Sequence, residues 1–365
     1  MPNSNFSPQL HSTSESLQRV RELVMAWGWN ATCYQIINPG IQHWFPKNHD
    51  GVIGFVRYNG VRIVAGAPVC RKDDLSAITR TFEQEAADAG ERVCYFGAEQ
   101  RLEDLFDISA DHSMVLLGAQ PTWQLQHWEQ IFDNHASLRA QLHRARNKGI
   151  WVGEWDIHRA HCHPMLAQCL SEWLATRGLP PLHFMVEPET LGRLFDRRVF
   201  VAQREKEIVG FTIASPVPQR NGWLIEQIIR GKNAPNGTAE LMVHWTAQML
   251  HQSGADFMTL GLAPLSQNAP APHSINPLWL RAVLSAVKAH GRRFYNFDGL
   301  DSFKAKFRPH SWDPIYAIAA TPTFTPRILY SIASAFSAGS PLLLVLRAVA
   351  GAIRTEWKWA THRSS

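Results

Sequence analysis

The first regular pattern along the chain is an amphipathic helix close to the N-terminus. Apolar side chains at Val20, Val24 and Trp27 recur at helical spacing behind a serine-rich segment, which predicts a helix over residues 14–27. Residues 1–13 are polar and lack the basic and then apolar build of a signal peptide. We expect these first residues to form a disordered lead-in.

A β-hairpin is predicted after this helix. Residues 52–58 and 61–65 are rich in β-branched and aromatic side chains, and Asn59-Gly60 between them tolerates the positive φ angles of a type I′ turn. The next predicted elements are a helix over residues 73–89 and a buried strand over residues 93–96. This alternation of strands and helices is typical of an α/β protein with a mixed sheet.

The same order of patterns occurs a second time in the chain. A Phe-Val pair at 55–56 leads through a hairpin to Ala-Pro-Val at 67–69, and a Phe-Val pair at 200–201 leads in the same way to Ser-Pro-Val at 215–217. Each copy is followed by a long helix and another buried strand. The repeat predicts two similar α/β units, of which the second is larger.

Length and composition agree with a folded protein of two units. The chain has 365 residues, of which 45% are hydrophobic and 18% charged, whereas a single domain typically has about 100–150 residues. The predicted divisions are a lead-in (1–13), a first unit (14–135), a linking helix (136–149), a second unit (150–325) and a C-terminal tail (326–365). The five cysteines form no CxxC pair, so neither a disulfide framework nor a zinc ribbon is expected, and a reducing cytoplasm fits this usage.

The linking helix is strongly basic. Its basic and imidazole side chains are Arg139, His143, Arg144, Arg146 and Lys148. No acidic residue lies in this run, and Leu138 and Leu142 form a small apolar stripe. Two interpretations stay open: a solvated surface, which is the common role of a charge run, or an electrostatic seat for a polyanion such as tRNA. The net charge of +5 adds a mild bias toward contact with phosphates.

A second concentration of cations lies in residues 291–316. The cations are Arg292, Arg293, Lys304, Lys306 and Arg308. A purely structural strand and turn would need far less charge, so we expect an anionic partner here. Lys304 and Lys306 are two residues apart and share a face if this segment is extended. The aromatic residues Phe307, Trp312 and Tyr316 are expected to form the core behind the cations.

Residues 294–316 follow a distinctive pattern, FYNF-x-GL-x-x-FK-x-KF-x-P, then W-x-P-x-Y, with one additional residue between Pro309 and Trp312. Together with the segments LGLAPL, RNKG and EWL, this pattern closely resembles the catalytic domain of phosphatidylglycerol lysyltransferases, a family of aminoacyl-lipid synthases. The resemblance covers roughly residues 136–320. It implies an α/β protein built from tandem acetyltransferase-like (GNAT) folds with mixed central sheets, joined by a basic helix.

The resemblance also implies a reaction. It is the transfer of an amino acid from aminoacyl-tRNA to the hydroxyl of an anionic membrane lipid such as phosphatidylglycerol, at the cytoplasmic membrane surface. Known members carry a many-helix flippase portion before this domain, and we expect a stand-alone transferase without it. An aminoacyl ester is already activated, so no cofactor is expected, and the reaction needs proximity, a base and oxyanion stabilisation.

The same fold leaves an alternative, an acyl-CoA-dependent N-acyltransferase of the GNAT type. Residues 230–237 would then have to form a pyrophosphate-binding loop, but their sequence, RGKNAPNG, does not have the glycine pattern of such loops.

Site residues follow from the chemistry of the implied transfer. The candidate catalytic residues are Lys304, Lys306, Asp298, Asp301 and Arg230. The candidate substrate-binding residues are Glu240, Asn236, Tyr295, Asn296 and Arg293. The cations would hold the tRNA terminus or a lipid phosphate, while the two aspartates would orient a lysine, accept a proton or only form salt bridges. Glu240 would bind the α-amino group or merely occupy the first turn of a helix.

Two further predictions concern metals and the tail. His158, His161 and His163 cluster with mixed spacing and without acidic partners, so no zinc site is expected. Residues 328–346 carry no charge but contain four Ser, one Gly and one Pro, and basic residues follow them. A spanning helix needs about 20 strongly apolar residues. We therefore favour an interfacial helix pair whose basic end contacts anionic lipid over a helix packed on the protein core.

Overall fold

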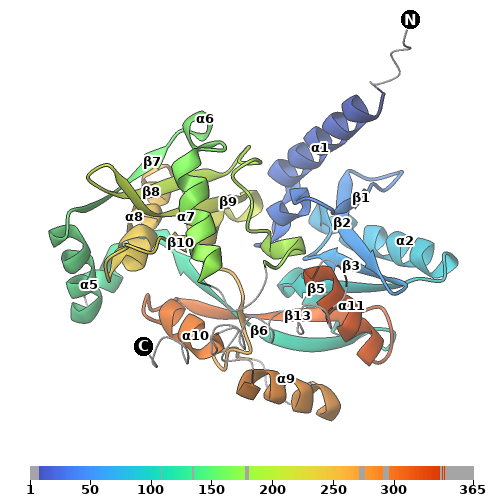
Figure 1. Ribbon diagram of the computed structural model, residues 1–365. Helices are drawn as coiled ribbons and strands as arrows, with labels where there is room; N and C mark the ends of the chain where they lie inside the picture. Colours follow the sequence, from blue (N-terminus) through green and yellow to red (C-terminus); the bar gives the residue numbers. More distant parts are fainter. Residues whose placement is uncertain are drawn as a thin grey trace, which may run out of the picture.

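A mixed β-sheet runs through the whole protein (Figure 1). The computed structural model describes residues 8–341 except 108, 134, 177–180, 271–275, 291–295, 338 and 340. The strands are β1 (Gln42–Trp44), β2 (Gly51–Tyr58), β3 (Val61–Ala65), β4 (Val69–Cys70), β5 (Arg92–Ala98), β6 (Ser113–Gln124), β7 (Ile150–Trp155), β8 (Arg198–Arg204), β9 (Glu207–Val217), β10 (Gly222–Arg230), β11 (Phe257–Thr259), β12 (Ala263–Pro264) and β13 (Ser311–Ala319). Their order in space is β1-β2-β3-β5-β13-β6-β11-β10-β9-β8-β7, with β4 on β2 and β12 on β6.

Helices lie on both faces of this sheet. The α-helices are α1 (Pro8–Trp27), α2 (Leu75–Asp88), α3 (Gln100–Phe106), α4 (Trp128–Asp133), α5 (Ala136–Asn147), α6 (Ile157–Ala160), α7 (Pro164–Ala175), α8 (Thr238–Gln252), α9 (Leu278–His290), α10 (Phe297–Ala305) and α11 (Pro326–Phe336). Short 3-10 helices are η1 (Cys33–Ile37), η2 (Lys72–Asp74), η3 (Leu125–His127), η4 (Phe184–Val186) and η5 (Pro218–Arg220). The predicted α/β class with a mixed sheet is therefore confirmed.

Most local predictions agree with the structure. The hairpin of β2 and β3 turns at Asn59 and Gly60, whose φ angles of 53° and 70° are those that a type I′ turn requires. The predicted helices over residues 14–27 and 73–89 are present as α1 and α2. However, α1 begins at Pro8, so part of the expected disordered lead-in is helical. Residues 1–7 of that lead-in lie outside the described part.

The second half shows how the sheet separates two layers of helices. Side chains alternate along β8, so that Phe200 and Ala202 pack in one cluster with α8, whereas Val199 and Val201 pack in another cluster with α7. Both faces of these strands are therefore buried, which explains why β8 and β9 read as nearly continuous apolar runs.

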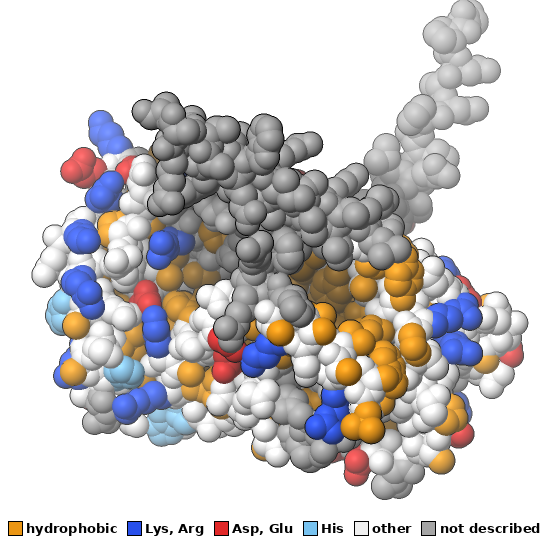
Figure 2. Space-filling view, turned by 60° about the horizontal axis from the view of Figure 1, so that its bottom comes forward, with side chains coloured by type: hydrophobic (Ala, Val, Ile, Leu, Met, Phe, Trp, Pro, Cys, Tyr) orange, Lys and Arg blue, Asp and Glu red, His pale blue; other side chains and the backbone are white. Residues whose placement is uncertain are grey.

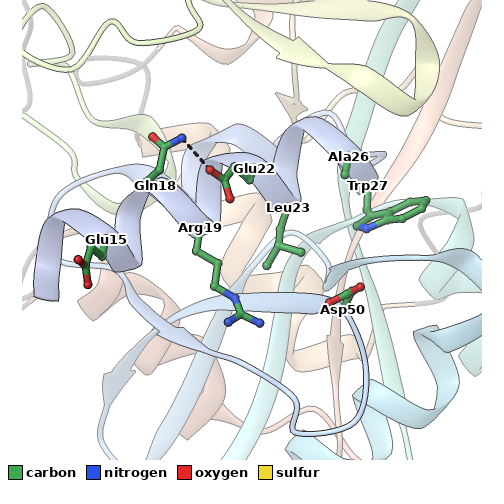
Figure 3. Close-up of a pocket in the computed structure, with 8 residues that line it drawn as sticks. All are labelled: Glu15, Gln18, Arg19, Glu22, Leu23, Ala26, Trp27 and Asp50. Carbon is green, nitrogen blue, oxygen red and sulfur yellow. Dashed lines mark hydrogen bonds between the residues drawn. The ribbon is translucent and has the colours of Figure 1, made fainter.

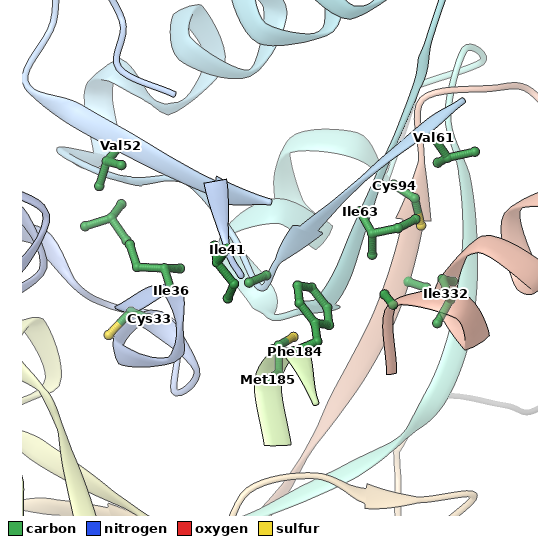
Figure 4. Packing of buried hydrophobic residues seen from close by; sticks show 14 of the residues in the cluster. Cys33, Ile36, Ile41, Val52, Val61, Ile63, Cys94, Phe184, Met185 and Ile332 are labelled. Atoms are coloured by element: carbon green, nitrogen blue, oxygen red, sulfur yellow. The ribbon is translucent and has the colours of Figure 1, made fainter. Parts of the chain in front are cut away.

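The core of the first half also receives side chains from distant parts of the chain. Figure 4 shows Ile36 and Ile41 packed with strand residues such as Ile63, and Ile332 of α11 lies against the same cluster. Phe184 and Met185 of η4 enter this core as well. Segments that follow the linking helix thus complete the core of the residues that precede it.

The repeated pattern is present, with one correction. In the first half α2 follows the β2–β3 hairpin and the short β4 and leads to β5, which is parallel to β3. In the second half β10 intervenes between the predicted hairpin of β8 and β9 and the helix α8, and β11 is parallel to β10. The structural counterpart of β3 is therefore β10 and not β9. The repeat in the sequence matched β3 with β9, because β9 and β10 both belong to antiparallel pairs of similar composition.

The two halves share their central strands. β13 comes late in the chain but lies between β5 and β6, and β6 in turn pairs with β11 (Figure 1). The sheet is thus continuous across the predicted division at residues 136–149. The division into two units stays a prediction about folding units.

Candidate functional site

The segment with the candidate lysines is helical. Residues Phe297–Ala305 form α10, and the side chain of Asn296 caps it by accepting a hydrogen bond of 2.9 Å from the Gly299 backbone N–H. The expectation that Lys304 and Lys306 share a face of an extended segment is therefore wrong. The Asn296 cap favours the start of a helix here, and residues two apart on a helix point in different directions.

Lys304 is a buried amine. Its side chain is 4% exposed, and Nζ donates hydrogen bonds of 2.7 Å and 2.9 Å to the backbone carbonyls of Gly261 and Leu262. Burial lowers the pKa of Lys304 to about 7, although the nearby charge of Asp301 acts in the opposite direction. A neutral amine has two N–H groups and a free electron pair, so this geometry leaves that pair available to accept a proton.

Lys306 has a different partner. Its Nζ lies 3.1 Å from Oε1 of Glu240, which is buried in the first turn of α8. The same ammonium group lies 5.7 Å from the centre of the Phe303 ring. The structure therefore brings Lys306 and Glu240 together as an ion pair.

The two candidate aspartates also have partners. Asp298 lies 3.1 Å from Lys288 of α9, so the salt-bridge alternative describes its contact. Asp301 accepts a hydrogen bond of 2.9 Å from the Asn268 side chain through Oδ2, and its buried Oδ1 has no hydrogen-bond partner among the described residues. Asp301 is thus the better placed of the two to act on Lys304.

The remaining candidates are spread more widely. Arg230 is exposed at the end of β10, and in the described part of the chain no hydrogen bond or ion pair joins it to Lys304 or Lys306. Asn236 is exposed in the loop before α8. Arg293 and Tyr295 lie outside the described residues. The predicted aromatic core is confirmed for Phe307 and Tyr316, whose side chains are buried.

The basic helix α5 lies beside the start of α8. Leu138 and Leu142 are buried, as predicted, whereas the basic and imidazole residues of α5 are exposed. Gly237 permits the contact with α8, because a Cβ at this position would come within 2.3 Å of the Gln141 carbonyl oxygen, and its φ of 92° also favours glycine. Figure 2 shows Lys and Arg side chains gathered on the left of the molecule, the side where α5 lies in Figure 1. Through α8, this basic surface adjoins the Lys306–Glu240 pair.

Sequence reasoning missed a buried carboxylate between the two halves. Glu99 follows β5 and is 4% exposed; it accepts hydrogen bonds of 2.6 Å from the Ala31 backbone N–H and 3.0 Å from Arg220. Arg220 in turn lies 3.7 Å from Asp313 of β13. Burial raises the pKa of Glu99 to about 7, while Arg220 acts in the opposite direction. A carboxylate directly after a buried strand was the only local signal of this centre in the sequence.

A surface hollow lies apart from Lys304, Lys306 and Glu99. It is an open trough along α1, lined by Glu15, Gln18, Arg19, Glu22 and Asp50 among others (Figure 3). Gln18 donates a hydrogen bond of 2.9 Å to Glu22 within it. Its exposed charges are of both signs, and it contains none of the candidate site residues.

Two kinds of site are absent from the part of the chain that the structure describes. There, no three His, Cys, Asp or Glu side chains come together as a metal site. None of the described helices has both the length and the apolar character needed to cross a bilayer. The expectation of an interfacial helix pair over residues 328–346 is wrong for the part that the structure describes. Residues 328–336 belong to α11, whose Ile328, Ile332 and Ala335 are buried in the core of the first half, as the alternative of a helix packed on the core predicted. The tail after residue 341 lies outside the described residues.

Comparison with known sequences gives a consistent result. Residues 14–319 match the family described as phosphatidylglycerol lysyltransferase, C-terminal. The chain is 21% identical over 274 residues to a phosphatidylglycerol lysyltransferase of Bacillus subtilis (strain 168), an alignment that covers 73% of this chain and 31% of that protein. This chain thus spans about a third of the length of the curated relatives that it matches.

Solved structures share the fold. A C-terminal domain from Agrobacterium fabrum, described as that of a candidate lysylphosphatidylglycerol synthetase, superposes with a TM-score of 0.75 at 22% identity, covering 89% of this chain and 98% of that one. L-PGS from Bacillus licheniformis superposes with a TM-score of 0.73 at 19% identity, covering 91% and 97%. At these identities the likeness concerns the fold.

Proposed function

This chain belongs to the phosphatidylglycerol lysyltransferase C-terminal family, and on that premise we propose that it transfers an amino acid from aminoacyl-tRNA to the hydroxyl of an anionic membrane lipid such as phosphatidylglycerol. The observation that carries the proposal is the family match over residues 14–319, which includes the whole α5–α8–α10 region. The buried amine of Lys304 would supply the base for this reaction, and the basic surface of α5 would bind the tRNA.

Lys304 is the proposed base. In the reaction the lipid hydroxyl oxygen attacks the carbonyl carbon of the aminoacyl ester, and the bond from this carbon to the tRNA ribose oxygen then breaks. The hydroxyl proton passes to Nζ of Lys304 and from there to the departing ribose oxygen. A pKa of about 7 suits both steps, because the amine can accept and release a proton near neutral pH.

Lys306 and Glu240 are proposed to position the substrates. Lys306 is partly exposed and carries its charge beside the basic surface of α5, where a phosphate of the tRNA terminus would find a second cation. Glu240 would exchange its contact with Lys306 for the ammonium group of the amino acid. This is the role that the sequence predicted for Glu240. In the free protein its carboxylate is paired with the ammonium group of Lys306.

The exposed side chains of α5 form the proposed tRNA-binding surface. Each phosphate contact made by a cation adds about 0.9 to the slope of log affinity against log salt for a duplex. The double change Arg144→Ser with Lys148→Ser should therefore weaken tRNA binding and reduce this slope by up to about 2. A matched control is Arg80→Ser, which changes an exposed arginine of α2, in the first half of the protein and away from α5 in the sequence. An unchanged slope in the α5 variant would exclude this surface.

Contact with the cytoplasmic membrane surface is supported by α9. This helix exposes Leu278 (79%), Val283 (40%) and Val287 (45%), together with Arg281. Hydrophobic side chains also gather to the right of the centre in Figure 2, which looks onto the side where α9 lies. Apolar side chains beside cations are typical of helices that lie in an anionic bilayer surface.

A transfer assay tests the proposal directly. Purified protein is incubated with phosphatidylglycerol vesicles and with lysyl-, alanyl- or arginyl-tRNA in separate reactions, and the extracted lipids are analysed by mass spectrometry. We expect aminoacylated lipid with at least one donor and none after ribonuclease treatment. Product from acetyl-CoA and an amine acceptor, with no aminoacylated lipid from any tRNA, would instead identify the N-acyltransferase alternative.

A further inference from the structure

The strand β7 carries an exposed tryptophan at one edge of the sheet. Trp151 is 51% exposed, the largest aromatic side chain among the exposed hydrophobic residues that the structure describes. β7 pairs with β8 and is the last strand in the order of the sheet, so no described strand covers its other side (Figure 1). The strand follows directly after α5, the helix whose exposed cations form the proposed tRNA-binding surface.

Gly153 determines how the indole ring of Trp151 lies. A Cβ placed at Gly153 would be 2.6 Å from Cζ3 of Trp151 and 3.5 Å from each of the two adjoining ring carbons, Cε3 and Cη2. These distances place the edge of the ring, and not its face, toward the backbone. The indole therefore stands upright on the edge strand, with about half of its surface open to solvent.

A second flat group lies on the same face of β7. Side chains alternate along a strand, so Trp151, Gly153 and Trp155 share this face. The guanidinium carbon of Arg159 lies 3.7 Å from the centre of the Trp155 ring. Trp155 is only 4% exposed, whereas Arg159 is exposed, so the guanidinium group covers the buried ring. An indole ring and a guanidinium plane are therefore presented along one strand.

The open charges beside Trp151 are positive. Lys148 of α5 precedes it by three residues, so the two Cα atoms are at most about 11 Å apart. Lys148 and Arg159 are both exposed, and neither forms an ion pair with another described residue. The acidic residue of β7, Glu154, lies on the opposite face and is bound to Arg198 at 2.6 Å. These charges favour an anionic partner.

We propose that Trp151 stacks on an unpaired base of the tRNA, while Lys148 and Arg159 hold the phosphates that flank this base. Unpaired bases bind proteins by stacking on aromatic rings or on arginine planes, and cations beside them follow the backbone. A bilayer is the less suitable partner, because the exposed aliphatic side chains that enter a bilayer gather on α9 and not on β7. The inference rests on the proposed function, because the RNA is the donor of that reaction.

Binding of deacylated tRNA to the purified full chain tests this contact without any transfer activity. We expect Trp151→Ala to weaken binding about fivefold to 100-fold, and Trp151→Phe to keep most of the affinity. The slope of log affinity against log salt should stay unchanged in Trp151→Ala, because a neutral ring releases no counterions. Tyr330→Ala, which removes an exposed aromatic side chain of α11, is the matched control and should bind as the unmodified protein does.

Two RNA probes separate stacking from general attraction to phosphate. They are a single-stranded RNA and a blunt-ended duplex of the same length. Trp151→Ala should weaken binding of the single strand and leave binding of the duplex unchanged, since the bases of a duplex are already stacked on one another. Equal losses on both probes, or no loss on either, would overturn the proposal.

The remaining outcomes distinguish this inference from the proposed function. If the transfer assay gives aminoacylated lipid but Trp151→Ala binds tRNA as the unmodified protein does, the stacking contact is overturned and the reaction stands. If Trp151→Ala instead loses binding to phosphatidylglycerol vesicles and keeps its affinity for tRNA, the partner of this strand is the bilayer and the inference is also overturned. Failure of the unmodified protein to bind any RNA would overturn both.

Discussion

Glu99 and Lys304 are ionisable groups of opposite charge that are buried to the same extent. Each is 4% exposed, and burial moves the pKa of both to about 7, upward for Glu99 and downward for Lys304. Their partners differ, because Glu99 pairs with the guanidinium of Arg220, whereas among the described residues the hydrogen bonds of Lys304 go to two backbone carbonyls. The comparison indicates that Glu99 has a counter-ion that holds it in place, while Lys304 is kept as an amine that can exchange a proton.

The largest expected effect is on catalysis. Lys304→Met keeps the shape of the side chain but removes the nitrogen, and we expect transfer to fall at least 100-fold because the proposed base is lost. Met fills the same space but leaves the Gly261 and Leu262 carbonyls without this donor, so circular dichroism is used to check that the variant is folded. Lys206→Met, in the exposed turn between β8 and β9, is the control and should keep most of its activity. Transfer by Lys304→Met at the unmodified rate would make Lys304 a structural residue like Glu99.

The next effect concerns the ion pair of Glu99. Arg220→Met removes the cation from a buried carboxylate, and we expect the free energy of unfolding at pH 7 to fall by about 3 kcal/mol. Adding Glu99→Gln should recover part of this loss, because the remaining side chain no longer carries charge. Urea denaturation measures both values. A single variant as stable as the unmodified protein would show that Glu99 does not depend on its counter-ion.

The pH dependence of stability sharpens the comparison further. The raised pKa of Glu99 means that its contribution to stability is complete below about pH 4.5 and is lost as the pH rises through about 7. The lowered pKa of Lys304 acts the other way, with a contribution present above about pH 10.5 and lost as the pH falls toward 7. Each group should change the unfolding free energy by about 1.4 kcal/mol per pH unit within its window.

Variants assign these two windows to their groups. Glu99→Gln should flatten the decrease between pH 4.5 and 7, and Lys304→Met should flatten the increase between pH 7 and 10. Chemical denaturation at a series of pH values gives both curves. Curves that keep their slopes in these variants would show that burial does not set the two pKa values.

The smallest expected effect is that of the exposed neighbour. Lys306 is two residues from Lys304 but its side chain is 41% exposed. Lys306→Gln should therefore change the unfolding free energy by less than about 1 kcal/mol, while transfer decreases because the phosphate loses a cation. A large loss of stability would mean that the Lys306–Glu240 pair, and not burial of Lys304, holds α10 on α8.

Much of the candidate site was visible in the sequence as residue types but not as contacts. Lys304, Lys306 and Glu240 were all selected, yet their pairing was not, because Glu240 lies far away in sequence and meets Lys306 only when α8 and α10 pack together. The charge of Lys304 was expected to hold an anion, and instead its burial favours the neutral form. Burial of one side chain depends on every segment that covers it, so local sequence cannot reveal it.

The sequence by itself determined the elements whose causes are local. Asn59-Gly60 specified the hairpin turn through its tolerance of positive φ, and the spacing of Leu138 and Leu142 specified which face of α5 is buried. The tertiary structure alone decided that β13 lies between β5 and β6, and that Glu99 is enclosed with Arg220. The order of the strands and the enclosure of Glu99 depend on the burial of apolar surface between segments that are far apart in the chain. The hydrophobic effect is non-directional, so the local sequence does not specify which distant segments pack together.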